Sequence, residues 1–279
     1  MGRLSWRSAT PHELISVIVT TYDRVDALNA VLHGLAGQTD SKFEVIVADD
    51  GSDQRTAELI EAWSSRFSRL AHVWQEHRDF RAAEIRNRAV LQSFGEICIF
   101  LDGDCIPRPN FIHMHRRLAE PGWFVAGNRV LLSRDLSARI LRDHLEPERW
   151  ALSQWLRARL RGEINRLQPL LSLPLGPLRR LGSAAWRSIR SANLAIRRTD
   201  LLHVDGFDAA FSGWGREDSD IVLRLMHSGI RRKDGRFATA VLHLWHAESD
   251  RSRLPANDGL LADALRQGRI KAQIGLSSL

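Results

Sequence analysis

Two carboxylates separated by a glycine follow an apolar run of strand-forming residues in the stretch from Glu96 to Asp104. The run is typical of a strand buried on both faces, and Asp102 and Asp104 stand at its carboxyl end. A carboxylate there can coordinate a hard divalent cation, and Gly103 lets backbone and ligand approach closely. An Asp-x-Asp pair alone is more often a solvated turn, so the interpretation depends on the rest of the chain.

Two earlier segments repeat this pattern of an apolar strand with a polar end. Residues 14–22 close in Thr20 and its neighbours, and residues 43–53 contain Asp50 just after the apolar run. Helical patterns follow both segments, and a further helix over residues 81–94 leads to the carboxylate strand. Alternating strands and helices predict an α/β fold with a parallel sheet, in which ligands bind beyond the carboxyl ends of the strands. The three polar ends are therefore expected to form one site.

The composition indicates a globular protein with an anionic partner. Of 279 residues, 44% are hydrophobic, and 40 Lys and Arg against 33 Asp and Glu give a net charge of +7. A nucleotide diphosphate, an anionic lipid surface or a nucleic acid would each fit this charge. Only Cys98 and Cys105 could form disulfides, which favours a reducing compartment. Residues 1–11 lack the apolar core of a signal peptide and no stretch is long enough to span a membrane, so a cytoplasmic location is expected.

The sequence lacks the usual glycine-rich nucleotide-binding motifs. No Gly-x-Gly-x-x-Gly follows the first strand, and no Gly-x-x-x-x-Gly-Lys-Ser/Thr occurs. A nucleotide held by a metal and by side chains remains possible. Arg81, Arg86 and Arg88 could reach its phosphates, or they could form a solvated helix face. Residues 81 and 88 share one side of the expected helix, whereas 86 lies on another.

Several segments, in their order along the chain, resemble family 2 glycosyltransferases of the GT-A fold: residues 16–24, 47–52, 86–89 and 100–104. Residues 206–220 resemble the acceptor-side motif of galactosyl- and N-acetylgalactosaminyltransferases, which include β1,4-galactosyltransferases and bacterial chondroitin-type polymerases. The resemblance covers roughly residues 14–130 and 186–250. It implies a mostly parallel central sheet flanked by helices, with a helical basic insertion.

The same resemblance implies one GT-A domain over residues 1–279. Residues 14–130 would be its nucleotide-sugar-binding half, residues 134–190 the insertion, and residues 191–250 the acceptor and catalytic half.

The resemblance assigns several residues to a UDP-sugar donor. Thr20, Tyr22 and Asp50 match positions that hold uracil and ribose, and Asp102 matches a carboxylate near the ribose. Thr20 stands where many members have proline, but a hydroxyl can still bond to the base. Arg81 matches a residue that contacts the base or a phosphate in the family, and Arg88 is a second candidate for this contact.

On the acceptor side, Trp214 offers a flat platform for a sugar ring, and Glu217 and Asp218 stand at the start of a helix expected over residues 219–227. An acidic helix N-terminus is common without any catalytic role. By the resemblance, Asp218 is the general base for the acceptor hydroxyl and Glu217 holds substrate hydroxyls. Asn193 is the candidate polar group near the donor sugar, with a strand-end amide bonded to backbone as the alternative.

Asp104 matches the direct ligand of Mn²⁺ or Mg²⁺ in the family, and two histidines are candidates to join it. His246 matches a ligand that follows the Glu-Asp helix in galactosyltransferase relatives, and His243 matches another in some members. Lone histidines are usually core or surface residues. A spacing of three also does not face one way along the strand expected over residues 241–246.

Residues 134–190 fall outside the family pattern and are rich in Arg, Leu and Trp. Basic amphipathic helices with Trp can lie on anionic membranes, so one hypothesis is peripheral docking at the inner face of the plasma membrane beside a lipid-linked acceptor. Lining of the acceptor cleft, or a helical lid packed on the core, are the alternatives.

These observations predict a metal-dependent inverting hexosyltransferase. It would move a hexose or N-acetylhexosamine, with galactose or N-acetylgalactosamine favoured, from a UDP-sugar to a hydroxyl of a saccharide or lipid-linked acceptor in surface polysaccharide or glycoconjugate synthesis. A nucleotidyltransferase of similar fold and a non-catalytic saccharide-binding module are the alternatives. Nucleic acid is not an expected partner, because no aromatic-basic reading motif accompanies the charge.

Overall fold

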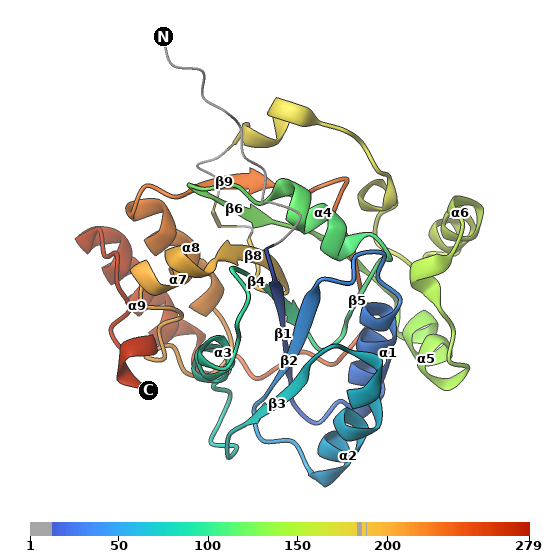
Figure 1. The fold of residues 1–279 in the computed structure, drawn as a ribbon, viewed down its shortest axis with the longest axis horizontal. Coiled ribbons are helices and arrows are strands. Elements are labelled where there is room, and N and C mark those ends of the chain that lie inside the picture. Colours follow the sequence, from blue (N-terminus) through green and yellow to red (C-terminus); the bar gives the residue numbers. More distant parts are fainter. Residues whose placement is uncertain (1–12, 183–185, 188) are drawn as a thin grey trace.

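The structure is a computed structural model that describes residues 13–279 except 183–185 and 188. The expectation about residues 1–11 falls outside this range. Among the described residues, a seven-stranded sheet has the order β3-β2-β1-β4-β8-β6-β9 (Figure 1). Its strands are β1 (Ile15–Thr21), β2 (Phe43–Asp49), β3 (Leu70–Trp74), β4 (Ile97–Asp102), β6 (Trp123–Ala126), β8 (Asn193–Arg197) and β9 (Arg231–Asp234).

The sheet is mostly parallel, as the sequence predicts. Only β8 runs antiparallel to its neighbours β4 and β6, while the other neighbouring pairs are parallel. The central strands β1, β2 and β4 are almost wholly buried, which explains their unbroken apolar sequences. In register, Thr20 of β1 stands opposite Asp102 of β4, and Thr21 stands opposite Asp49 of β2. The polar strand ends therefore meet at one edge.

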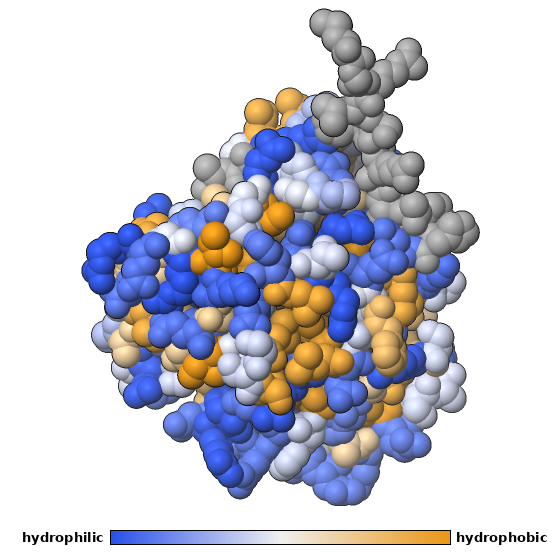
Figure 2. All heavy atoms as spheres, turned by 60° about the vertical axis from the view of Figure 1, so that its left-hand side comes forward, coloured by the Kyte–Doolittle hydropathy of each residue, from blue (hydrophilic) through white to orange (hydrophobic). Residues whose placement is uncertain are grey.

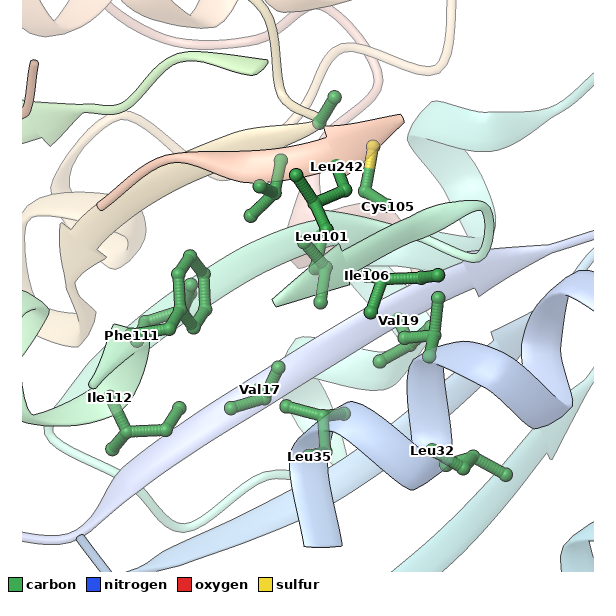
Figure 3. Close-up of a cluster of buried hydrophobic side chains, with 14 of the residues drawn as sticks. Val17, Val19, Leu32, Leu35, Leu101, Cys105, Ile106, Phe111, Ile112 and Leu242 are labelled. Carbon is green, nitrogen blue, oxygen red and sulfur yellow. The ribbon is translucent and has the colours of Figure 1, made fainter. Parts of the chain in front are cut away.

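Helices cover both faces of the sheet (Figure 1). Val17 and Val19 pack on the face of α1 (Val25–Ala36), whereas Ile18 packs on the opposite face with α3, α7 and α8. Figure 3 shows the first of these clusters, with Leu32 and Leu35 of α1 close to the strand residues. The other helices are α2 (Gln54–Trp63), α3 (Ala82–Leu91), α4 (Phe111–Leu118), α5 (Arg134–Arg142), α6 (Leu152–Leu160), α7 (Arg198–His203), α8 (Glu217–His227) and α9 (Leu254–Gln267).

A second, three-stranded sheet joins distant parts of the chain. It consists of β5 (Cys105–Pro107), β10 (Val241–His243) and β7 (Arg129–Leu131), and β10 lies between the other two. β10 is antiparallel to β5, so its last residue, His243, pairs with Cys105 next to Asp104. The expected strand over residues 241–246 is thus too long. The chain leaves the sheet after His243, where the Leu244 amide donates to the Asp104 carbonyl at 2.9 Å.

The segment 134–190 contains α5 and α6, which lie beside α1 in Figure 1. Trp155 of α6 is buried in the larger core cluster, so this segment is packed on the domain. Within the described part of the chain, every helix is too short or too polar to cross a bilayer. Figure 2, in which the side of α7 to α9 comes forward, shows a mainly hydrophilic surface interrupted by apolar patches.

Candidate active site

A cavity of about 640 Å³ opens where the strand ends meet the start of α8. Its described lining includes most of the residues that the sequence singles out: Thr20, Tyr22, Asp50, Asp102, Asp104, Trp214, Glu217, Asp218, His243 and His246. These residues come from five separate regions of the chain, and the topology of the two sheets brings them together. The convergence expected at the carboxyl ends of the strands is therefore present.

One end of the cavity is bounded by Asp50 and Tyr22. Asp50 is buried and accepts hydrogen bonds from the Gln75 side chain at 2.6 Å and from the Arg81 amide at 2.8 Å. Burial raises the pKa of its carboxyl group, against the lowering effect of these bonds. The Tyr22 ring stacks on His77, with centroids 4.2 Å apart and planes inclined by 9°. Together these groups offer a fixed acceptor beside a flat aromatic wall.

Gly103 lets β1 and β4 approach closely at the floor of the cavity. Its amide donates to the Thr20 carbonyl at 2.7 Å, and a Cβ at this position would lie 2.9 Å from the same oxygen. A side chain would have to displace the β1 backbone, so glycine is required by the close packing. The Asp-Gly-Asp spacing therefore has a structural cause as well as a chemical one.

Asp104, His243 and His246 form a compact cluster in the centre of the cavity. One ligand atom from each lies within 4.8 Å of those of the other two. The Nε2 atom of His243 is 3.6 Å from Asp104 Oδ1, and that of His246 is 3.5 Å from Asp104 Oδ2. The two rings meet because His246 lies three residues beyond β10, in a loop that turns back toward Asp104.

This cluster fits a divalent transition metal. Burial lowers the pKa of His243, which keeps the imidazole neutral and free to donate a lone pair. Neutral imidazoles are ligands for first-row transition metals, and a carboxylate also binds hard divalent cations such as Mg²⁺ and Mn²⁺. Cys105 is also near, but its thiol is fully buried and its pKa is raised well above the usual value by that burial. A protonated thiol is a poor metal ligand.

The acidic pair Glu217 and Asp218 begins α8 on the opposite side of the cavity. The preceding residue, Arg216, has a φ of +80°, and this left-handed turn directs the chain into the helix. Asp218 Oδ1 accepts from the Ser219 amide at 2.7 Å, and its Oδ2 lies 3.8 Å from Arg190 Nε. Glu217 Oε2 is buried with no hydrogen-bond partner. A buried oxygen of this kind is available to a ligand.

Both carboxyl groups are harder to ionise than usual. Burial, reinforced by the neighbouring charge of Asp218, raises the pKa of Glu217 to about 7. Burial also raises the pKa of Asp218, against the opposing influence of Arg190 and Arg86. A carboxylate with a raised pKa is a stronger base at neutral pH, and a half-protonated one can donate a hydrogen bond.

Arg86 is named from the sequence as a possible phosphate contact but is left out of the donor-binding assignment, which goes to Arg81 and Arg88. Its guanidinium is buried and contacts Thr20 Oγ1 at 3.1 Å, Glu217 Oε1 at 3.2 Å and Asp102 Oδ1 at 3.3 Å. The sequence contains a signal for it, because position 86 shares a helix face with Ala82, Ala89 and Val90, all of which are buried. An arginine on the apolar face of a helix indicates a buried cation.

Three predicted donor-binding residues lie outside the described lining of the cavity. Arg81 is paired with Glu84 and the Glu76 carbonyl, and Arg88 is paired with the same Glu84 at 2.8 Å. Asn193 bonds to His115 at 3.0 Å and donates to two backbone carbonyls. Its amide thus has the backbone-bonding role that was the alternative, and the cavity receives its arginine from the other helix face.

Two protein-family models match the chain. The model for glycosyl transferase family 2 matches residues 16–172, and the model described as the N-terminal domain of galactosyltransferase matches residues 183–247. The cavity is lined by residues of both matches. Asp50 and Asp104 lie in the first match, and Glu217, Asp218 and His246 lie in the second.

Curated relatives include known sugar transferases. Validoxylamine A glucosyltransferase of Streptomyces hygroscopicus subsp. jinggangensis is 29% identical over 239 residues, which cover 80% of this chain and 54% of that protein. Hyaluronan synthase of Pasteurella multocida is 25% identical over 243 residues, or 81% of this chain and 24% of the synthase. Chondroitin synthase of Escherichia coli is 25% identical over 77% of this chain and 32% of its own length. The chain thus spans about half or less of these relatives.

Solved structures share the fold. A mannosyltransferase from Pyrobaculum calidifontis, in complex with GDP-Man and Mn²⁺, matches with a TM-score of 0.58 and 17% identity over 95% of this chain and 75% of its own. TarS 1-349 of S. aureus, in complex with UDP, matches with a TM-score of 0.59 and 16% identity over 94% of this chain and 67% of its own. At this identity the likeness concerns the fold.

Proposed function

This chain is a glycosyltransferase that belongs to glycosyl transferase family 2 and has the GT-A fold, and from this premise we propose that it is a metal-dependent inverting enzyme that uses a UDP-sugar. The single observation that carries the proposal is one cavity with two chemically distinct sides. Asp104 and two histidines form a metal-ligating cluster, and Asp218 faces the same space from the start of α8. A metal-bound leaving group and a base are the two parts that direct displacement at a sugar carbon needs.

The donor's nucleotide would occupy the end of the cavity formed by Thr20, Tyr22 and Asp50. Asp50 is suited to accept from the imide N–H of uracil, and the exposed side of the Tyr22 ring is suited to stack on the base. The nucleotide ligands of the two solved neighbours, GDP-Man and UDP, support a sugar-nucleotide donor. The choice of UDP rests on Asp50 and on the resemblance, in which Thr20, Tyr22 and Asp50 match positions that hold uracil and ribose.

Asp104, His246 and His243 would hold the divalent metal, Mn²⁺ or Mg²⁺, and the Mn²⁺ in the Pyrobaculum calidifontis mannosyltransferase complex supports such a metal. When bound, the metal neutralises the diphosphate and stabilises it as a leaving group. Asp102 lies in the same cavity, where the resemblance places it near the ribose. Arg86 holds the Asp102 carboxylate and Thr20 in place, so it acts as a positioning residue for the donor side.

Asp218 would remove the proton from the acceptor hydroxyl as its oxygen attacks the anomeric carbon. Its raised pKa brings the carboxylate closer to the pKa that suits a general base at neutral pH. Glu217, held on one oxygen by Arg86, would use its other oxygen for a sugar hydroxyl. Trp214 lines the same side and would support a sugar ring. Attack from the face opposite the leaving group inverts the anomeric centre.

The transferred sugar is proposed to be galactose or N-acetylgalactosamine, and the acceptor a saccharide or lipid-linked saccharide. The match of residues 183–247 to the galactosyltransferase model supports the sugar class. The matched polysaccharide synthases support a role in the synthesis of a surface polysaccharide or glycoconjugate. We also propose that residues 14–130 and 191–250 divide donor and acceptor binding within one domain.

Product analysis tests this function against a nucleotidyltransferase and a binding module. The purified chain is incubated with Mn²⁺ and each of a set of UDP-sugars, without acceptor, and products are identified by mass spectrometry. Slow release of UDP and free sugar that stops in chelator supports the proposal. A parallel incubation with UTP and sugar 1-phosphates tests the rival, because release of pyrophosphate there would identify a nucleotidyltransferase. No turnover of any UDP-sugar, with or without a panel of saccharide acceptors, would favour a binding module.

We further propose that α6 attaches the enzyme to an anionic membrane surface. Leu152, Leu156 and Leu160 are 53%, 49% and 80% exposed, and at four-residue spacing they fall within an arc of about 80° on the helix. The buried Ala158 faces away from this arc, and Arg159 and Arg157 flank the arc on its two sides. An exposed leucine face edged by arginines suits the boundary between lipid headgroups and acyl chains.

A further inference from the structure

A second cavity, of about 540 Å³, adjoins the candidate active site. The two cavities share Arg24, His246 and Ala247 in their linings, so the loop that carries a proposed metal ligand separates them. The remaining described wall of the second cavity is formed by α5, by Trp245 and by Asp26 of α1. Its volume is in the range of small-molecule sites.

The lining of this cavity is basic and contains an exposed aromatic ring. Arg24, Arg134 and Arg142 all contribute, against one carboxylate in the described lining, Asp26. Trp245 is 42% exposed, and its backbone is fixed by donation from its amide to Ser137 Oγ at 2.8 Å. A tryptophan and several guanidinium groups around one hollow can bind a sugar ring and an anion together.

Of these three cations, Arg134 is the one that the fold explains least. Arg24 is paired with Asp26 at 3.1 Å, and Arg142 is paired with Asp143 at 2.8 Å. Among the described residues, Arg134 forms no ion pair, and its guanidinium carbon lies 5.1 Å from the centre of the Trp245 ring. It is also the first residue of α5, where the helix dipole disfavours a positive charge. With respect to the residues that the structure describes, the Arg134 guanidinium is therefore an unpaired cation held against an aromatic ring, and it is available to a ligand.

We infer that this second cavity is an acceptor subsite for a saccharide that carries a phosphate or carboxylate group. The inference rests on the proposed transferase function, because it places the charged part of the acceptor next to the loop that borders the donor's diphosphate. The reacting hydroxyl would enter the main cavity, and the anionic group would remain beyond His246 and Ala247, near Arg134 and Arg142. The positive charge of this wall then favours acceptors that carry a negative charge.

Binding of three small probes tests this subsite. The chain is first titrated with UDP and Mn²⁺, which fill the donor side and prevent the probes from binding there. Methyl β-D-glucoside, methyl β-D-glucuronide and glucose 1-phosphate are then compared by ligand-observed NMR. We expect at least one of the two anionic probes to bind at least fivefold more tightly than the neutral glucoside. The comparison of glucuronide with phosphate shows which anion the subsite prefers.

Substitutions test whether the arginines of the second cavity cause the preference for anionic probes. Arg134→Ala, and separately Arg142→Ala, should reduce the preference to about twofold or less, whereas Arg266→Ala removes an exposed arginine of α9 outside the described lining of both cavities and should leave it unchanged. Equal binding of neutral and charged probes to the wild-type chain would overturn the inference, as would a preference that survives in both cavity variants or is lost equally in the control. If UDP and Mn²⁺ fail to bind, the proposed function fails, and the same comparison on the free protein still tests the subsite.

Discussion

Glu217 and Asp218 are neighbours in the sequence but face different partners. Glu217 bonds to Arg86 on the donor side, while Asp218 lies near Arg190 and bonds to the first turn of its own helix. Two carboxylates of raised pKa in one cavity can divide the work of base and hydrogen-bond partner. The division proposed here assigns proton removal to Asp218.

Substitution Asp218→Asn tests this assignment. The amide keeps the size and hydrogen-bonding capacity of the side chain but cannot take a proton, so transfer should slow by about 10²-fold or more. Affinity for UDP with Mn²⁺, measured in parallel, should change by less than about threefold. A variant that transfers sugar at the wild-type rate would remove Asp218 as the base.

The raised pKa of Glu217 predicts that the free energy of unfolding depends on pH. Its pKa is raised in the folded protein from the ordinary value of 4.5 to about 7, so the folded state holds its proton more tightly than the unfolded state. The charged groups that face it are Arg86 and Asp218, with Asp102 and Arg190 beyond them. Its ionisation therefore costs stability as the pH rises from about 4.5 to 7.

In the Glu217→Gln variant this cost is absent. Relative to wild type, the free energy of unfolding of the variant should improve between pH 5 and pH 8, by up to about 3 kcal/mol. Urea denaturation of both proteins at the two pH values measures the change. A difference between the proteins that is the same at pH 5 and pH 8 would contradict the raised pKa.

At the scale of elements, Arg86 connects its own helix to three other elements. It extends from α3 to the end of β1, the end of β4 and the start of α8, through Thr20, Asp102 and Glu217. A buried cation with two carboxylate partners is costly to remove, since both carboxylates would lose their compensation. The donor and acceptor sides of the site are thus mechanically linked through one guanidinium.

We predict that Arg86→Met lowers the free energy of unfolding by about 3 kcal/mol or more. The matched change Arg88→Met, on the same helix, removes an exposed arginine paired with Glu84 and should cost about 0.5 kcal/mol. Denaturant titrations of the two variants give the comparison. Similar losses in both would show that Arg86 contributes no more than a surface ion pair.

The proposed membrane contact of α6 is also tested at this scale. Replacement of Leu156 and Leu160 by Glu should abolish sedimentation with vesicles of phosphatidylglycerol and phosphatidylcholine at low salt, because it places charge on the apolar face. Exposed leucines away from α6, Leu202 and Leu265, serve as the control pair. Absence of binding by the wild-type protein, or loss in the control pair alone, would contradict the proposal.

The elements were predictable to different degrees. Strands β1, β2 and β4 are central, parallel and buried on both faces, so burial leaves an unbroken apolar signal with a clear end. The end of β10 was not predictable, because the pairing with β5 stops at His243 but the next two residues, Leu244 and Trp245, are still apolar. That early end is what lets His246 turn toward Asp104, a geometry that strand periodicity alone argued against.

The residues of the site were predictable where a short motif fixes them. Asp50, Asp104 and Asp218 stand at strand or helix ends, so their positions follow from topology. Arg81, Arg88 and Asn193 depend on which way a side chain turns from its element, and local ion pairs and core amide bonds decide that. Sequence spacing carries no information on those local contacts. It does place Arg86 on the buried face of α3, and Arg86 is the arginine of this helix that reaches the cavity.

At the scale of the whole molecule, the account requires one cavity that holds a nucleotide through a metal. In the proposal, the parallel sheet would supply the nucleotide end and α8 the base, and the small second sheet brings His243 beside Asp104. The excess of arginine provides a basic surface for anionic donor, acceptor and lipid alike. The metal is the part that joins the donor side to the chemistry.

Isothermal titration of the chain with UDP, with Mn²⁺ and in chelator, tests this requirement most directly. The account predicts that UDP binds at least tenfold more tightly with Mn²⁺ than in chelator, and that Asp104→Asn removes this difference. A mixed oligonucleotide, titrated in the same buffers, should bind far more weakly than UDP with Mn²⁺. UDP affinity that is identical with and without metal in the wild-type protein would contradict the account.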